Sequence, residues 1–427
     1  MMGGHPGIMG LLSALRTPLK GPWGLVSSLF CSLVLVGCSG LQQLPNVMYL
    51  TAGSSSDQGI DARTREEVQA RIAALESGYR QIYPLTRFQI SLYPEDLLVT
   101  SIQRRNEAAL GPDLLLVNGV TALSLLEAGR IDPYPANSIN LAAFEPGLLA
   151  RVRDPKGRLA GIPLLVQAQV ACFNRQRISQ APATLEELLA VGASGRPIGL
   201  SADLINLFWT AGSLGAVSSI NKAAAGQALD AQDRANLVRW MSWLQNANNQ
   251  LRVSFFADQG TVTSEFLAGR LDWIPCNSVS LPRLRHSLGN RLGVSALPGS
   301  NWGRPSPVNR LRVLALGTSS SASGRDRALA FTRFATNPLI QRMLTLGVQT
   351  VLPANRFVMV PLKSSEILDA MDTSYQESQV IAPALESIAV RDARLMKAQA
   401  QITSLLFGEN TPESAAESLA TLFQKSQ

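Results

Sequence analysis

Residues 160 to 174 read Ala160-Gly161-Ile162-Pro163-Leu164-Leu165-Val166-Gln167-Ala168-Gln169-Val170-Ala171-Cys172-Phe173-Asn174. This is a long, extended and mostly apolar run that a single proline interrupts. Strands in globular proteins usually span about five or six residues, so a run of this length is more than one sheet needs. We therefore expect the run to cross from one lobe of the protein to another.

Upstream of this run, apolar strands alternate with amphipathic helices. We expect strands at 46–52, 88–93 and 113–117, and helices at 64–83 and 121–128. Near-continuous apolar strands that alternate with helices are typical of parallel α/β layers. The predicted fold class is therefore α/β.

Downstream, the same kind of pattern returns, with helices near 203–214 and 231–247 and a strand at 270–275. The run from Gly293 to Gly299 is a second candidate crossing. A strand at 311–316 then leads through a serine-rich loop to a helix at about 325–335, and the chain from Pro361 onward is mostly amphipathic helix.

The N-terminus has the pattern of an export signal. Arg16 and Lys20 are the only charges before residue 38, and an apolar run shorter than a membrane span follows them. The run ends in Leu35-Val36-Gly37-Cys38-Ser39, which resembles the lipobox of bacterial lipoproteins. We expect residues 1–37 to be a signal peptide, Cys38 to carry the lipid, and residues 38–45 to form a tether.

Two cysteines remain in the body of the mature chain, Cys172 and Cys276. In an oxidising compartment they can pair as a disulfide. They can equally be two buried free thiols, because cysteine is often a small core residue. The sequence leaves both alternatives open.

Composition argues against nucleic-acid binding and against catalysis. The formal charge is +7, and it falls to +5 when the two basic signal residues are removed, with no run of Lys and Arg of nucleic-acid type. Two histidines and the absence of the usual nucleophile, phosphate-loop and zinc motifs indicate neither an enzyme nor a metal or cofactor protein. Several arginines gather around the second crossing, and we interpret them as a solvated face, or as a face turned toward an anionic membrane or a partner protein. They are Arg283, Arg285, Arg291, Arg304, Arg310 and Arg312.

Several short segments, in order, resemble the solute-binding lipoproteins of bacterial ABC importers, the large extracellular class that includes maltose-binding protein. They are Gly111-Pro112-Asp113-Leu114-Leu115-Leu116-Val117, Leu125-Leu126-Glu127-Ala128-Gly129-Arg130-Ile131-Asp132-Pro133, Gly161-Ile162-Pro163, Cys172-Phe173-Asn174-Arg175, Thr184-Leu185-Glu186-Glu187-Leu188, Phe266-Leu267-Ala268-Gly269-Arg270-Leu271-Asp272-Trp273 and Leu297-Pro298-Gly299. Each segment is weak alone, but their order and spacing extend the resemblance over about 370 residues of the mature chain.

The resemblance implies a two-lobed periplasmic-binding-protein fold (type II), with parallel-sheet lobes joined by a hinge of crossing strands. We expect an N-lobe from 46–163 and 297–350, and a C-lobe from 164–296 and 351–427. It also implies a lipid-anchored periplasmic monomer that captures a small solute between the lobes and delivers it to the transmembrane subunits of a permease.

Ligand sites in such sheets lie at the carboxyl ends of the strands, which selects candidate binding residues. Gly53, Ser54 and Asn118 follow two first-lobe strands, and Gln167 and Gln169 interrupt the apolar crossing. Asp203, Asn277 and Ser278 follow second-lobe strands. Ordinary turns and hinge hydrogen bonds explain the same residues without a ligand.

Tryptophans add a second signal, because aromatic rings stack on the apolar faces of sugars. Trp209, Trp273 and Trp302 lie near predicted strand ends or loops, and we predict that they contact the ligand. For Trp209 and Trp273 the alternative is packing in the core. The favoured solute is a carbohydrate or another polyhydroxylated compound, such as an oligosaccharide or a glycosyl-glycerol. The alternatives are a polyamine or other cationic solute, or an envelope lipoprotein that has lost transport.

Overall fold

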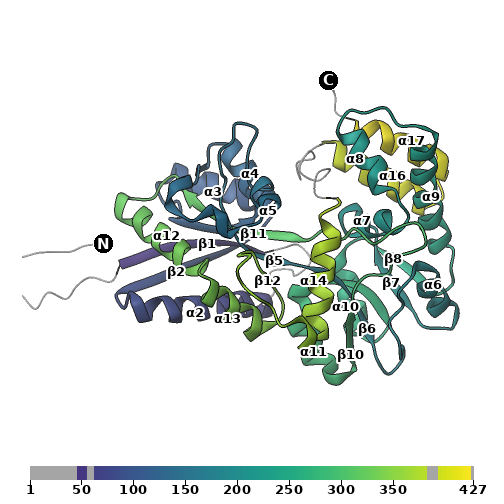
Figure 1. Ribbon diagram of the computed structural model, residues 1–427, viewed down its shortest axis with the longest axis horizontal. Coiled ribbons are helices and arrows are strands. Elements are labelled where there is room, and N and C mark those ends of the chain that lie inside the picture. Colours follow the sequence, from purple (N-terminus) through teal and green to yellow (C-terminus); the bar gives the residue numbers. More distant parts are fainter. Residues whose placement is uncertain (1–45, 55–61, 382–392, 425–427) are drawn as a thin grey trace, which may run out of the picture. The chain divides into compact units, whose positions relative to one another are not determined.

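The computed structural model describes residues 46–54, 62–381 and 393–424 (Figure 1). The predicted signal peptide, the tether and Cys38 lie outside these residues. Residues 46–427 form one compact unit of the chain. Within it, the strands make two separate sheets of seven and five strands.

The first sheet has the order β12-β5-β11-β3-β1-β2, and β4 pairs with β11. β1 is parallel to β2 and β3, whereas β11 is antiparallel to both β3 and β5. The strands are β1 Asn46–Ser54, β2 Thr86–Pro94, β3 Leu114–Asn118, β4 Ile131–Asp132, β5 Ile162–Gln167, β11 Arg310–Gly317 and β12 Leu352–Pro353.

Helices cover this sheet, and α2 shows why they form where they do. Ile72, Leu75 and Tyr79 recur at helical spacing along α2 and are buried. The Tyr79 ring packs edge-on against Phe88 of β2 and Phe331 of α12, with centroids 5.9 and 5.3 Å away. The helices of this lobe are α2 Ala62–Ile82, α3 Leu98–Glu107, α4 Gly119–Glu127, α5 Pro146–Ala150, α12 Ala322–Ala335 and α13 Pro338–Val348, with short 3-10 turns at Ala136–Ser138 and Leu141–Ala143.

The second sheet has the order β10-β6-β9-β7-β8. β7 is parallel to β8 and β9, and β6 is antiparallel to β9 and β10. Its strands are β6 Gln169–Asn174, β7 Ile198–Ser201, β8 Val253–Phe256, β9 Trp273–Asn277 and β10 Leu292–Ser295. The predicted α/β class is confirmed, but both sheets are mixed rather than parallel, because the chain returns from one to the other in the opposite direction.

The second lobe is the more helical of the two. Its helices are α6 Leu185–Ala193, α7 Leu204–Ser213, α8 Val217–Ala224, α9 Ala231–Asn248, α10 Gln259–Leu267, α11 Leu281–Leu288, α14 Glu366–Ser378, α16 Ala393–Leu406 and α17 Pro412–Phe423, with 3-10 turns at Ser278–Ser280, Gly289–Arg291 and Leu362–Ser364. The predicted helices at 203–214 and 231–247 are thus confirmed. The predicted strand at 270–275 lies slightly later, as β9.

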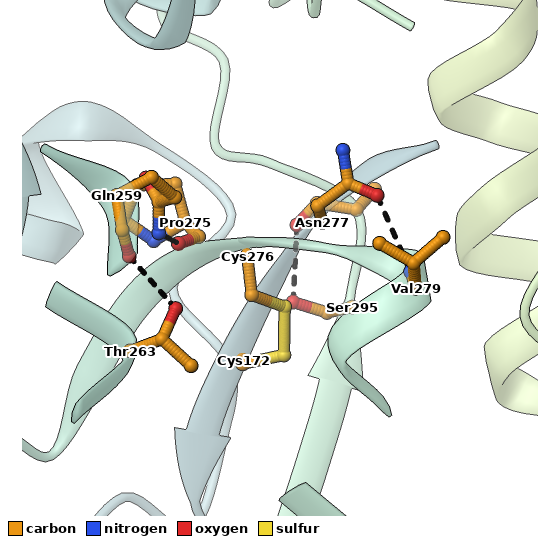
Figure 2. Close-up of a disulfide and its surroundings, with 9 residues drawn as sticks. Cys172, Gln259, Thr263, Pro275, Cys276, Asn277, Val279 and Ser295 are labelled. Atoms are coloured by element: carbon orange, nitrogen blue, oxygen red, sulfur yellow. Dashed lines mark hydrogen bonds between the residues drawn. A yellow bond between two sulfur atoms is a disulfide. The ribbon is translucent and has the colours of Figure 1, made fainter. Parts of the chain in front are cut away.

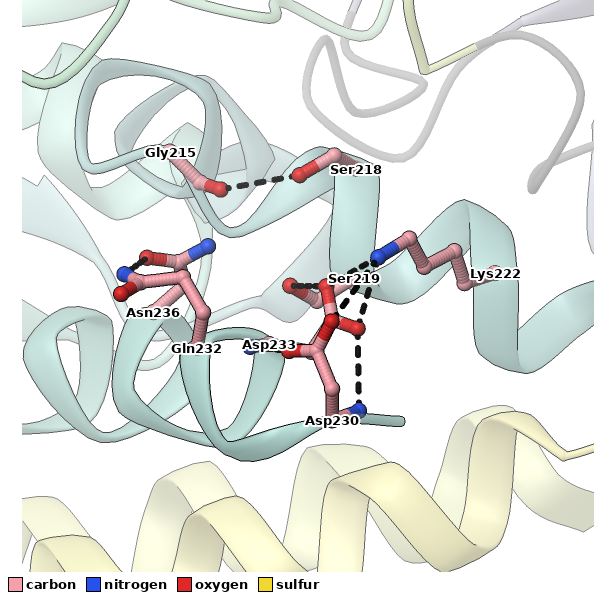
Figure 3. A network of polar contacts seen from close by, with 8 residues as sticks. All are labelled: Gly215, Ser218, Ser219, Lys222, Asp230, Gln232, Asp233 and Asn236. Carbon is pink, nitrogen blue, oxygen red and sulfur yellow. Dashed lines mark hydrogen bonds and ion pairs between the residues drawn. The ribbon is translucent and has the colours of Figure 1, made fainter. Parts of the chain in front are cut away.

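A buried carboxylate joins two of these helices (Figure 3). The Asp233 side chain on α9 is 4% exposed and accepts hydrogen bonds from Lys222 Nζ at 2.8 Å and Ser219 Oγ at 3.0 Å, both on α8. Burial alone would raise the pKa of Asp233, but the hydrogen bond from Lys222 and those from Asp230 and Ser219 hold it below the usual value. Both carboxylate oxygens of Asp233 accept hydrogen bonds within this network. We therefore interpret the network as structural.

The long run that suggested a crossing is two strands rather than one. β5 ends at Gln167 in the first sheet, Ala168 follows, and β6 starts at Gln169 in the second sheet. Pro163 lies in β5 where the pairing with β11 shifts by one residue, as expected for a residue without a backbone N–H. The sheet changes at Ala168, so the lobe boundary predicted after residue 163 falls inside β5.

The other boundaries also differ from those expected. Gly299 O accepts a hydrogen bond from Leu185 N, and Ser306 N donates one to Trp209 O, so the chain after residue 297 stays with the second lobe until about residue 309. β12 at Leu352–Pro353 still belongs to the first sheet. The second and third crossings therefore come somewhat later than the hydrophobic pattern suggested.

Candidate functional site

An arginine and a glutamate hold together the carboxyl ends of the first sheet's parallel strands. Arg312 Nη1 donates to Glu95 Oε2 at 3.0 Å and to Asn118 Oδ1 at 2.9 Å. Its Nη2 donates to Gly53 O and Leu116 O, both at 2.7 Å. The Arg312 and Glu95 side chains are only 6% and 11% exposed, so this is a buried ion pair with its hydrogen bonds largely satisfied.

Glu95 completes this cluster from the loop that follows β2. Its Oε1 accepts the Asn118 N–H at 2.6 Å, and its own N–H donates to Ser54 O at 2.8 Å. A Cβ added at Gly53 would overlap Glu95 Oε2, so the network needs glycine at this point. Gly53, Ser54 and Asn118 thus lie close together around Glu95, although Ser54 is buried and its hydroxyl donates to Tyr93 O.

The predicted glutamines lie at the first crossing, but they do different things. Gln167 is half-buried at the end of β5 and pairs with Arg310 of β11. Gln169 is buried, and its Nε2 donates to Asn206 O at 2.9 Å, which connects the crossing to the start of α7. Its Oε1 is buried and has no hydrogen-bond partner.

A hinge of three crossing segments meets at Asn309. Asn309 Oδ1 accepts the Gln169 N–H at 2.9 Å and the Ser374 hydroxyl at 3.1 Å. Asn309 Nδ2 donates to Ser374 O at 3.0 Å, and Ser374 Oγ donates to Gln169 O at 2.7 Å. Asn309, which directly precedes β11, therefore joins the start of β6 to α14.

Ser278 belongs to the same hinge rather than to a ligand-facing edge. It is fully buried, and its Oγ accepts the Ala168 N–H at 3.0 Å and donates to Thr350 O at 2.7 Å. Asn277 is also buried and caps the turn after β9 by accepting the Val279 N–H at 3.2 Å. Asp203 is half-buried and caps α7, accepting from Ile205 N at 2.9 Å and Asn206 Nδ2 at 3.1 Å.

Two of the predicted sugar-stacking tryptophans are core residues. Trp209 and Trp273 are both 0% exposed and pack against each other, with ring centroids 6.1 Å apart. A side chain without exposed surface offers no face to a solute, so the prediction for these two residues is corrected. Their apolar surroundings fill the interior of the second lobe.

Trp302 is exposed, but it lies apart from the strand ends. Its side chain is 59% exposed, and the Arg239 guanidinium lies 3.6 Å from its ring centroid. The surrounding loop contacts the C-terminal end of α7, since Ser300 Oγ bonds Ser213 O and Gly303 lies against Gly212. α7 has ten residues, which puts about 15 Å between this end and Asp203.

Cys172 and Cys276 form a disulfide (Figure 2). They lie on the neighbouring antiparallel strands β6 and β9, with Cα atoms 5.8 Å apart, and both are buried. The two cysteines are 104 residues apart in the sequence. It therefore fastens the two strands whose hinge-side ends carry Gln169 and Asn277.

The sequence interpretation missed four residues of this region: Glu95, Asn309, Arg312 and Ser374. Arg312 had been assigned to a solvated face, yet it is buried within an otherwise apolar strand. A charged residue inside an apolar strand requires a partner, which was the available signal. Glu95 and Asn309 had no such signal, because both follow or precede a strand in ordinary loop sequence.

Groups of three or more His, Cys, Asp or Glu with metal-binding geometry are absent from residues 46–54, 62–381 and 393–424. In the same residues, every helix is too short or too polar to cross a membrane. The candidate site consists of amide, hydroxyl and paired charged groups. They lie where the strand ends of both sheets approach the hinge.

Comparison with known proteins agrees with this arrangement. A family model described as bacterial extracellular solute-binding protein matches residues 87–358. The chain belongs to the bacterial extracellular solute-binding protein family. The sequence matches none of the curated proteins with which it was compared.

Solved structures of other binding proteins share the fold. The GacH receptor of Streptomyces glaucescens, solved unliganded and with acarbose, has a TM-score of 0.68 at 15% identity and covers 88% of this chain and 97% of its own. Maltose-bound MalE3 of T. maritima gives 0.65 at 17% identity, with 88% and 99% covered. The maltose-maltodextrin binding protein of Alicyclobacillus acidocaldarius gives 0.63 at 15% identity, with 89% and 100% covered. The predicted two-lobed periplasmic-binding-protein fold is confirmed.

Proposed function

We propose that this protein captures a carbohydrate or another polyhydroxylated solute between its two lobes and delivers it to the permease of an ABC importer. The observation that carries the proposal is the match of fold over nearly the whole length of binding proteins described with maltose, maltodextrin or acarbose. The proposed role is binding and release, with no chemical step.

Half-buried polar residues at the strand ends support a hydroxyl-rich ligand. Asn118 and Gln167 lie at the ends of β3 and β5, and Asp203 lies just after the end of β7 in the other lobe. Side-chain amides both donate hydrogen bonds to sugar hydroxyls and accept them, and a carboxylate accepts hydrogen bonds from the same hydroxyls. We propose these three residues as ligand contacts, with the Arg312–Glu95 pair fixing the position of Asn118.

The hinge residues provide the second part of the mechanism. Gln169, Ser278 and Asn309 hold the crossing segments by hydrogen bonds between side chains and backbone. A solute that contacts both lobes favours the closed arrangement over the open one, and only the additional contacts of the closed form shift the equilibrium. We propose that permease subunits distinguish the two forms.

Export and anchoring are proposed from the N-terminal sequence. The lipobox at Gly37 and Cys38 would place the protein on the outer side of a membrane through a lipid, as a monomer. The Cys172–Cys276 disulfide supports an oxidising compartment, where such bonds persist.

The function is tested by calorimetric titration with maltose, maltotriose, acarbose, a glycosyl-glycerol and spermidine. We expect saturable one-to-one binding of at least one carbohydrate and none of spermidine. Gln167→Ala should weaken that binding by about tenfold, within the range for an anchoring contact. Trp302→Ala, at the other end of α7, is the matched control and should change it by less than about twofold.

Two results would overturn the proposal. Binding of spermidine in place of every carbohydrate would assign the protein to cationic solutes. If calorimetry detects no binding of any of the five compounds, an envelope lipoprotein without a transport role would be favoured. A tenfold loss in the Trp302→Ala variant with an unchanged Gln167→Ala variant would move the site to the loop beside α7.

A further inference from the structure

A separate pocket in the second lobe is lined by two arginines. It has a volume of about 550 Å³ and lies where α11, β10 and the start of α14 come together (Figure 1). Its lining residues are Arg175, Arg285, Gly289, Asn290, Leu292 and Ile367. A volume of this size suits a small-molecule ligand.

The pocket is distinct from the strand ends at the hinge. Arg175 follows β6 at the end opposite Gln169, and the five residue steps of that strand span about 17 Å. The pocket is therefore not the site proposed above for the carbohydrate.

Among the residues that the structure describes, no carboxylate pairs with the charge of Arg285. It is partly buried near the end of α11, and its Nη2 is buried without a hydrogen-bond partner. Burial lowers the pKa of this guanidinium, and no acidic group opposes the effect. The C-terminal end of α11 favours a cation, but it leaves Nη2 without an acceptor.

Arg175 is held in place on the opposite side of the pocket. Its N–H donates to Arg291 O at 2.7 Å and its Nε to Leu292 O at 3.1 Å, and its Nη2 pairs with Glu366. The Glu366 side chain is 71% exposed, so water weakens its hold on the arginine. The described residues that line the pocket include no Asp or Glu.

We propose that this pocket binds a small anion bearing a phosphate or carboxylate group, held between Arg285 and the fixed Arg175. Guanidinium groups present paired N–H donors that match the oxygens of such anions. A bound anion would also supply a negative charge to balance the positive charge of Arg285. Both a free phosphate and the headgroup of an anionic phospholipid offer this chemistry.

The test is titration of inorganic phosphate into the protein by calorimetry, in a chloride buffer of constant ionic strength. We expect one saturable site whose affinity falls at least tenfold in Arg285→Gln. Arg283→Gln removes the same charge from the same helix outside the pocket lining, and should change the affinity by less than about twofold. If Arg285→Gln does not fold, Arg285→Lys keeps the charge, loses the paired donors and should still weaken binding severalfold.

A parallel arm distinguishes the two sources of the anion. Flotation with vesicles of phosphatidylglycerol and phosphatidylcholine, against phosphatidylcholine alone, tests a headgroup in the same three variants. Arg285-dependent binding in either arm supports the pocket and identifies the source. The proposal is overturned if neither phosphate nor vesicles bind, or if Arg283→Gln and Arg285→Gln weaken binding equally, as general attraction to a basic surface would.

Discussion

The Oδ1 atom of Asn309 accepts the backbone N–H of Gln169 at 2.9 Å, which joins the second crossing between the lobes to the first. Ser374 of α14 adds the third segment through two further hydrogen bonds with Asn309. Each of these groups is buried, so the hinge depends on polar contacts that water does not replace. A change in the arrangement of the lobes must therefore keep these hydrogen bonds of Asn309 or break them.

Asn309→Ala should destabilise the protein by about 2–3 kcal/mol, because it leaves buried hydrogen-bonding groups on Gln169 and Ser374 without a partner. The measurement is urea unfolding at equilibrium. Asn246→Ala, at an exposed position of α9, is the control and should remain within about 0.5 kcal/mol of wild type. Equal effects of the two substitutions would remove Asn309 from the hinge.

Breaking the buried Arg312–Glu95 pair should cost about 3–5 kcal/mol, because either residue alone leaves an uncompensated buried charge. Arg312→Met and Glu95→Gln test this separately, and the double variant should recover much of the loss. The surface pair of Arg270 and Glu265 is the control, for which Glu265→Gln should leave the free energy of unfolding close to that of wild type. Strictly additive losses in the double variant would mean that the pair is not coupled.

Removing the disulfide by Cys172→Ala and Cys276→Ala together should lower the free energy of unfolding by about 2–5 kcal/mol. The bond constrains a long loop in the unfolded chain, and thermal unfolding measures the loss. Thiol titration of the unfolded wild-type protein without reductant provides the check. Two reactive thiols at these positions would show that the cysteines are not paired.

Glu377 makes stability depend on pH. Burial raises the pKa of its carboxyl to about 7, with Arg304 acting in the opposite direction, and its Oε2 has no hydrogen-bond partner. Since the folded protein holds the proton more tightly than the unfolded chain, its stability contribution is complete below the ordinary glutamate value of about 4.5 and is lost as pH rises toward 7.

Glu377→Gln should remove this dependence. Relative to wild type, the free energy of unfolding of the variant should rise as the pH increases from 4.5 to 7. The difference should level off near 1–2 kcal/mol at about pH 8. It is smaller than the full pKa shift implies, because the side chain is partly exposed. Unfolding midpoints across that range measure it. A difference between the two proteins that is constant with pH would contradict the assignment.

The fold was largely predictable from the sequence, because its signals are local. The helices expected at 203–214 and 231–247 are α7 and α9, and both begin after an aspartate that caps them. The run from Ala160 to Asn174 was expected to join two lobes. The division of this run at Ala168 could not be predicted, because a continuous apolar sequence is compatible with one strand in one sheet or with two strands in two sheets.

The site was harder to predict, because the same residue types serve in cores, hinges and ligand contacts. Trp209 and Trp302 were both predicted to contact a sugar, yet one is buried against Trp273 and the other is exposed beside Arg239. Ser278 follows a strand as a ligand contact would, but Ala168 and Thr350 use its hydroxyl. Only the three-dimensional pairing of distant segments separates these cases.

The most direct test of carbohydrate capture between the lobes is a distance between them. Spin labels attached at Leu110→Cys in the first lobe and Leu251→Cys in the second, both exposed positions, report that distance by pulsed electron resonance in the chain from residue 39 onward. With a saturating mixture of maltodextrins, we predict a shorter and narrower distance distribution than in buffer or spermidine. An unchanged distribution in the carbohydrate sample would contradict the account.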